Sequence, residues 1–150
     1  MTARTQKETP ATILIGRWEQ AGRKLTALGQ EFPAEKYEST LVKGARTVGD
    51  VLRHVAFWNQ YVADSARGKK ADDTANELPK AEYSGKTRII DALQKSTADA
   101  SAALKAREAD MDLKTIEMLA TFIEHTTEHY GQLVVYARLN GIVPPASREA

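Results

Sequence analysis

Cysteine is absent from the 150-residue sequence, which excludes disulfide bonds, thiolate zinc sites and cysteine nucleophiles. Excess charge is also absent, because 21 lysines and arginines stand against 20 aspartates and glutamates without a block of either sign. This balance does not favour a nucleic-acid partner. No run of eighteen apolar residues occurs, so we expect no membrane-spanning segment. Residues 1–10 lack the apolar core of a secretory signal, and we expect a soluble, cytoplasmic protein.

The length and composition indicate one globular domain. A chain of 150 residues can bury a single core, and 42% hydrophobic with 27% charged residues is ordinary for a soluble protein. We expect a flexible tail over residues 1–10, one domain over residues 11–145 and a short tail over residues 146–150.

Apolar residues recur at the spacing of an α-helix in four segments, and no segment has a convincing strand pattern. The predicted helices cover about residues 11–28, 48–66, 86–107 and 113–140. Four amphipathic helices without a sheet predict an all-α four-helix bundle.

Capping residues support the ends of these helices. Thr47 is expected to cap the second helix, with Asp50 in the position of a capping-box acid. Gly141 is placed to end the last helix, and the prolines at 144–145 prevent its continuation. Residues 68–80 are the most polar and least periodic segment, and we expect them to form an exposed loop.

The three histidines are the candidate functional residues. His125 and His129 are four residues apart in the last predicted helix, so their side chains share one face. His54 lies in the apolar arc of the second predicted helix. A lone inward histidine is usually a hydrogen-bonded core residue. Three inward imidazoles need a shared partner, because burial without one strands their polar nitrogens. This pattern favours a divalent metal site with open coordination positions.

A second interpretation comes from the order of residues between the two neighbouring histidines. His125, Glu128 and His129 match the H-x-x-E-H pattern of inverted zinc peptidases. Those enzymes are much larger and take a third, carboxylate ligand from far downstream, whereas only 21 residues follow His129 here. Glu128 is also about 100° around the helix from His129. We therefore do not favour a peptidase.

Four aromatic residues lie one or two helical turns from the histidines. They are Trp58, Tyr61, Phe122 and Tyr136. Core packing is the ordinary role of such residues, and a tyrosine hydroxyl near an open metal position orients a substrate or a water molecule in other sites. We consider these four residues as candidates for a substrate pocket.

Two stretches of the sequence resemble a known family. Residues 47–56, a capped helix leading into His54, resemble the second helix of the DinB-like superfamily. Residues 125–141, with the prolines that follow, resemble its last helix and exit. The resemblance covers about residues 11–145.

The resemblance implies an up-down-down-up four-helix bundle, often dimeric, that holds a divalent metal with three histidines. Carried over to this sequence, the ligands are His54, His125 and His129. Family members with assigned activities include S-transferases and isomerases that use low-molecular-weight thiols such as bacillithiol or mycothiol. The family name records induction by DNA damage and does not imply binding to DNA.

These inferences predict a metal-dependent transferase that joins a low-molecular-weight thiol to a small electrophile. The absence of cysteine fits, because the thiol would arrive as a cosubstrate. Zinc or nickel is the expected metal, with iron and manganese as alternatives. The alternative functions are a metal-dependent hydrolase of a small molecule and a non-catalytic, metal-binding stress-response bundle. We expect a homodimer.

Overall fold

The computed structural model describes residues 7–148. Of the tails expected over residues 1–10 and 146–150, residues 1–6 and 149–150 lie outside the described part. Four α-helices make up the fold, and residues 7–148 contain no strand. The helices are α1 (Pro10–Glu31), α2 (Val48–Ala66), α3 (Lys86–Lys105) and α4 (Leu113–Leu139). Two short 3-10 helices, η1 (Ala34–Lys36) and η2 (Pro145–Ser147), follow α1 and α4. The predicted all-α four-helix bundle is confirmed.

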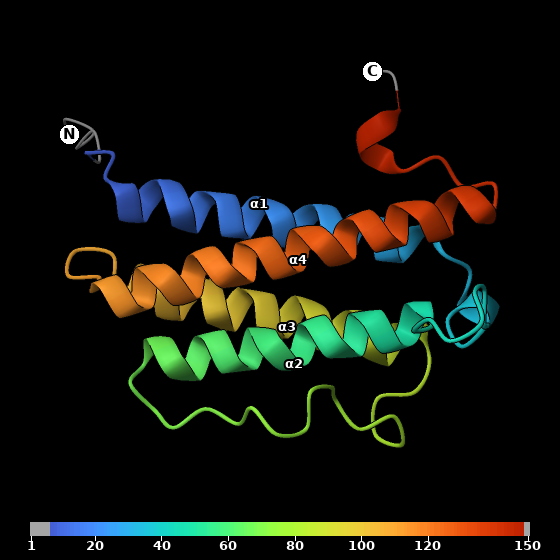
Figure 1. Ribbon diagram of the computed structural model, residues 1–150, viewed down its shortest axis with the longest axis horizontal. Coiled ribbons are helices and arrows are strands. Elements are labelled where there is room, and N and C mark those ends of the chain that lie inside the picture. Colours follow the sequence, from blue (N-terminus) through green and yellow to red (C-terminus); the bar gives the residue numbers. More distant parts are fainter. Residues whose placement is uncertain (1–6, 149–150) are drawn as a thin grey trace.

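The helices run up, down, down and up. In Figure 1, α1 and α4 point in one direction, while α2 and α3 point in the other. The connection between the two parallel helices α2 and α3 therefore crosses the length of the bundle, as residues 67–85 do in Figure 1. The most extensive packing is between α2 and α3 and between α1 and α4, and α2 also packs against α4. None of the described helices combines the length and apolar character that crossing a membrane requires.

The start of α2 is defined by the predicted capping box. The Thr47 hydroxyl accepts a hydrogen bond from the Asp50 amide at 3.0 Å, and the Asp50 carboxylate accepts one from the Thr47 amide at 3.5 Å. Gly141 follows α4 with a φ of 70°, a left-handed conformation that glycine adopts without strain. The caps therefore set the register of the two helices that carry the histidines.

The core consists of two clusters of buried apolar side chains. One surrounds the first half of α2 and includes Leu28, Leu52 and Leu133, and the other surrounds Trp18 and Leu119 near the opposite end. Full burial of such a leucine contributes about 1.5–3 kcal/mol. This packing holds α2 and α4 rigidly side by side.

Residues 67–85 are not simply an exposed loop, because part of this segment packs onto α2. Most of residues 68–80 are exposed as expected, but Leu78 is buried in the first core cluster. Its amide donates to the carbonyl of Arg53 at 3.3 Å. A single apolar residue among charged ones has no periodicity, so the sequence pattern could not predict this contact.

A buried arginine joins both long connections to α2. The Arg53 side chain is fully buried and pairs with Glu38 at 2.7 Å and Asp50 at 2.6 Å. It also donates to the carbonyl of Tyr83 at 3.0 Å. Partial burial raises the pKa of the Glu38 and Asp50 carboxyls, but hydrogen bonds and charge from Arg53 outweigh it and leave both pKa values below the ordinary range. The residue beside His54 is thus fixed to both connections.

Candidate metal centre

The three histidines meet between α2 and α4. Their ring centroids are 4.6–4.8 Å apart, and their ligand atoms all lie within 4.8 Å of one another. The Nε2 atoms of His54 and His125 are 2.9 Å apart. His125 and His129 share a face because they are one turn apart on α4, and the packing of α2 on α4 brings His54 to them. The histidines are therefore positioned to bind a metal.

A main-chain carbonyl determines the tautomer of His54. The Nδ1 atom of this ring lies 2.6 Å from the carbonyl oxygen of Asn76. A carbonyl can only accept, so Nδ1 carries the proton and Nε2 keeps its lone pair. Asn76 has a φ of 65°, an uncommon left-handed conformation for a residue other than glycine. The chain between α2 and α3 thus supplies a partner that orients one candidate ligand.

A chain of three hydrogen bonds determines the tautomer of His129. The Tyr136 hydroxyl donates to the carbonyl of Arg46 at 2.8 Å and accepts from the Gln132 Nε2 amide at 2.9 Å. The Gln132 Oε1 atom must then face His129, whose Nδ1–H donates to it at 2.9 Å. The direction of the chain is fixed by its end, because the Arg46 carbonyl accepts only. Nε2 of His129 is left free as a ligand.

His54 and His125 are in the form that binds metal at neutral pH. Burial, with smaller electrostatic contributions from Arg46 and His129, lowers the pKa of His54 to about 4 despite the opposing hydrogen bond to Asn76. Burial likewise lowers the pKa of His125 to about 4, together with His129, His54 and Arg46. Both rings are neutral at pH 7, so no proton competes with a metal ion there.

The donor set fits a divalent metal ion. Two nitrogens about 2.0–2.1 Å from one ion lie about 2.9–3.4 Å apart when the angle between their bonds is about 90–110°. The separation of the His54 and His125 nitrogens is at the short end of this range. Two of the rings have a partner for the outer nitrogen, an arrangement that orients metal-binding histidines generally. Within residues 7–148, no carboxylate belongs to this group of ligand atoms.

Three of the four aromatic candidates lie together beside His125. Trp58 stacks on Phe122 with ring centroids 5.5 Å apart, and Tyr61 contacts both rings. Phe122 lies 5.7 Å and Trp58 6.4 Å from the His125 ring. The indole Nε1–H of Trp58 donates to the side chain of Asn76 at 3.0 Å, so Asn76 holds both the histidine and the aromatic cluster.

Tyr136, the fourth candidate, has a different place. It is 4% exposed, belongs to the first core cluster, and its hydroxyl is used by Gln132 and the Arg46 carbonyl. It stands behind His129 and supports that ring through Gln132.

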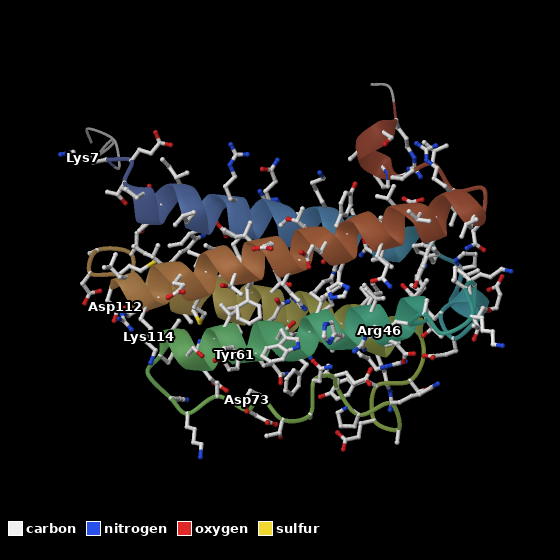
Figure 2. The ribbon with its side chains drawn as sticks, viewed as in Figure 1. Lys7, Arg46, Tyr61, Asp73, Asp112 and Lys114 are labelled. Carbon is white, nitrogen blue, oxygen red and sulfur yellow. The ribbon has the colours of Figure 1, made fainter. Side chains whose placement is uncertain are left out.

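An open groove begins at the aromatic cluster. A cavity of about 380 Å³ is lined by Trp58 and Phe122, and it shares Tyr61, Asp73, Lys114 and Met118 with a second cavity of about 410 Å³. Figure 2 shows Tyr61, Asp73 and Lys114 in one part of the molecule. Sequence analysis missed Asp73 and Lys114, because they come from separate segments and neither belongs to a motif. The combined volume suits a small molecule.

A larger cavity of about 740 Å³ lies between α1 and α3, away from the histidines. Its lining is mostly small and polar residues such as Thr26, Thr97 and Ser101. None of its lining residues contacts the histidine cluster, so we place the functional site at the histidines and the aromatic groove beside them.

Glu128, the acid of the H-x-x-E-H pattern, is exposed on α4 and is not part of the histidine cluster. Glu124, one turn earlier, is exposed as well. A peptidase base must reach the ligands of its metal, so the position of Glu128 agrees with our rejection of the H-x-x-E-H interpretation.

Comparison with known proteins agrees with this architecture. No curated protein matches the sequence significantly. The family model of the DinB superfamily matches residues 17–133, a span that includes His54, His125 and His129. Because the match covers well over half of the sequence, this chain belongs to the DinB superfamily.

Proposed function

We propose that this protein holds a divalent metal ion with His54, His125 and His129 and transfers a low-molecular-weight thiol to a small electrophile. The observation that carries the proposal is the convergence of three imidazoles, two of them with an assigned outer partner, beside an open groove. Zinc or nickel is the proposed metal, because neutral imidazole suits both, with iron or manganese as alternatives.

The residues of the chain have separate tasks in this reaction. Asn76 and Gln132 orient the rings of His54 and His129, so that their Nε2 atoms face the metal position. The groove beside His125 receives the electrophile against Trp58 and Phe122. A divalent metal, when bound, lowers the pKa of a thiol that joins it. The thiol would give its proton to solvent water, and its sulfur would form a bond to an electrophilic carbon, from which a leaving group departs with the bonding electrons.

The Tyr61 hydroxyl is proposed to assist. It lines both parts of the groove, and among residues 7–148 no group hydrogen-bonds to it. A free hydroxyl at this position can donate to the leaving group or to a polar group of the electrophile.

The first alternative is a hydrolase of a small molecule, in which water takes the place of the thiol. Three neutral imidazoles are also the donor set of metal sites that activate water. The groove favours either enzyme over a non-catalytic metal-binding bundle, because a purely structural site needs no open space beside it.

A transfer assay distinguishes these functions. Protein loaded with zinc or nickel is incubated with a chlorodinitrobenzene and, in turn, with cysteine, bacillithiol or mycothiol, and the coloured thioether is followed. We expect turnover that His125→Ala abolishes and Glu128→Gln leaves unchanged. Turnover of ester substrates without thiol transfer would favour the hydrolase. No turnover in either assay would contradict an enzymatic role.

The proposal includes a homodimer. Several large apolar side chains are exposed on the helices, among them Ile13, Val135 and Leu139. When such residues form a patch on the surface, the patch is typically covered by another protein. Sedimentation velocity at several protein concentrations tests the dimer, and a monomer throughout would contradict it.

A further inference from the structure

The candidate metal centre contains positive charge without a matching negative charge. Three neutral imidazoles leave the double charge of a divalent ion uncompensated, and no carboxylate within residues 7–148 joins their cluster. The Arg46 guanidinium adds a cation near these residues, and its single contact with Glu77 offsets it only in part. Such a site favours an anionic ligand, because the negative charge of the ligand would offset positive charge that no protein carboxylate offsets.

Arg46 is connected to the site from two directions. Its carbonyl ends the hydrogen-bond chain that begins at His129. Its guanidinium pairs with Glu77, which directly follows the residue that holds His54. Figure 2 shows Arg46 where α2 begins, while Tyr61 lies farther along that helix. His54 lies between Arg46 and Tyr61 in the order of residues along the chain, so Arg46 is toward the start of α2 and the groove toward its end.

The ion pair between Arg46 and Glu77 leaves much of the guanidinium available. The two side chains make one contact, at 3.3 Å, and are 32% and 43% exposed. An exposed single contact of this kind is weak. Arg53, in contrast, is fully buried and hydrogen-bonded to both oxygens of Glu38. A carboxylate that meets Arg46 with two parallel hydrogen bonds would be a better partner than Glu77 is.

We propose that Arg46 binds the carboxylate of a small-molecule substrate beside the histidines, and that Glu77 competes with this carboxylate for the guanidinium. The inference rests on the proposed metal centre and names the substrate class as a carboxylic acid. Its reactive group would then extend from Arg46 toward the histidines and the groove. The charge of Arg46 also contributes to the low pKa values of His54 and His125, which agrees with its proximity.

Acetate is the probe that tests the proposal. Its affinity is measured by isothermal titration calorimetry on protein loaded with zinc, with the zinc content of each variant checked by elemental analysis. We expect Arg46→Gln to weaken acetate binding by at least about tenfold, since it removes a charge-assisted pair of hydrogen bonds. Arg46→Lys keeps the positive charge but loses the paired N–H donors of the guanidinium, so its acetate affinity should be intermediate. Glu77→Gln should tighten binding, because it removes the competitor.

Weaker acetate binding in Arg46→Gln together with tighter binding in Glu77→Gln would show that Arg46 recognises the carboxylate. If the ion pair only supported the structure, both substitutions would weaken binding. Arg46→Gln leaves the carbonyl that Tyr136 uses, so the chain to His129 is retained. Arg67→Gln is the matched control, because Arg67 is also partly exposed and paired with a carboxylate, Asp99, far from the histidines.

Two results would overturn the proposal. One is equal acetate affinity in the wild type and Arg46→Gln, and the other is weaker binding in Glu77→Gln. If the wild-type protein takes up no zinc, the proposed metal function fails by itself. The same titrations on metal-free protein then decide whether Arg46 binds acetate, and the absence of binding would overturn the inference too.

Discussion

At the scale of single residues, the site is defined by the partners of the histidine rings as much as by the rings. Asn76 and Arg46 contribute main-chain carbonyls, which accept and never donate. These two carbonyls determine which nitrogen of His54 and of His129 is free. The consequence is a pair of candidate ligands whose tautomers do not depend on the metal.

Loss of the Gln132 side chain should weaken metal binding. In Gln132→Leu the Nδ1–H of His129 loses its acceptor, and the ring is no longer held with Nε2 toward the site. Removal of such an outer partner typically weakens metal affinity about 10–100-fold. Competition with a chromophoric chelator measures the affinity. Gln132→Glu keeps an acceptor and is the control, and an unchanged affinity in Gln132→Leu would show that the chain does not orient His129.

Acid should destabilise the metal-free protein through His54 and His125. The pKa of His54 and His125 is about 4 in the folded state, against an ordinary value of 6.5. Between these values the unfolded chain binds more protons than the folded one, so the free energy of unfolding rises with pH. The stability is present above pH 6.5 and is lost as the pH falls from about 6.5 to about 4.

Urea unfolding of metal-free protein at several pH values measures this effect. Carboxyls such as Glu38 also have lowered pKa values and contribute in acid, so the comparison is with His125→Gln. The variant should lose less stability between neutral pH and about 4.5 than the wild type does. Parallel pH profiles for the two proteins would contradict a neutral, buried His125.

At the scale of elements, the caps and connections position the histidines. The sequence predicted the bounds of α2 correctly, because Thr47 and Asp50 form a local capping box whose chemistry is visible in four consecutive residues. The contact of Asn76 with His54 was not predictable in this way. It uses a main-chain carbonyl, which every residue has, and therefore leaves no signal in the side-chain pattern.

Removal of the cap should destabilise the bundle at the end where α2 begins. Thr47→Ala loses the acceptor for the Asp50 amide, a change that costs about 1 kcal/mol in the free energy of unfolding. Urea denaturation checks the value. Thr47→Ser keeps a hydroxyl in the same place and should stay close to the wild type. Equal stability of the alanine and wild-type proteins would show that the other contacts of this end set the start of α2.

At the scale of the whole molecule, the helical periodicity predicted the bundle and the resemblance predicted its up-down-down-up order. The meeting of His54 with His125 and His129 followed from their inward positions on two helices that pack together. The sequence pointed to Trp58, Tyr61 and Phe122 as pocket candidates, but not to the rest of the groove. Trp58, Phe122, Asp73 and Lys114 come from two helices and a connection, and only the tertiary packing of α2 and α4 brings them to one cavity.

The central claim is that the three histidines hold a metal, and elemental analysis tests it most directly. The protein should be purified without a histidine tag and without added metal. We predict near-stoichiometric zinc, nickel, iron or manganese in the wild type, its loss in His125→Ala, and its retention in Glu128→Gln, whose side chain is exposed on the same helix. A wild-type protein that contains no metal, and takes up none when several divalent ions are supplied, would contradict the account.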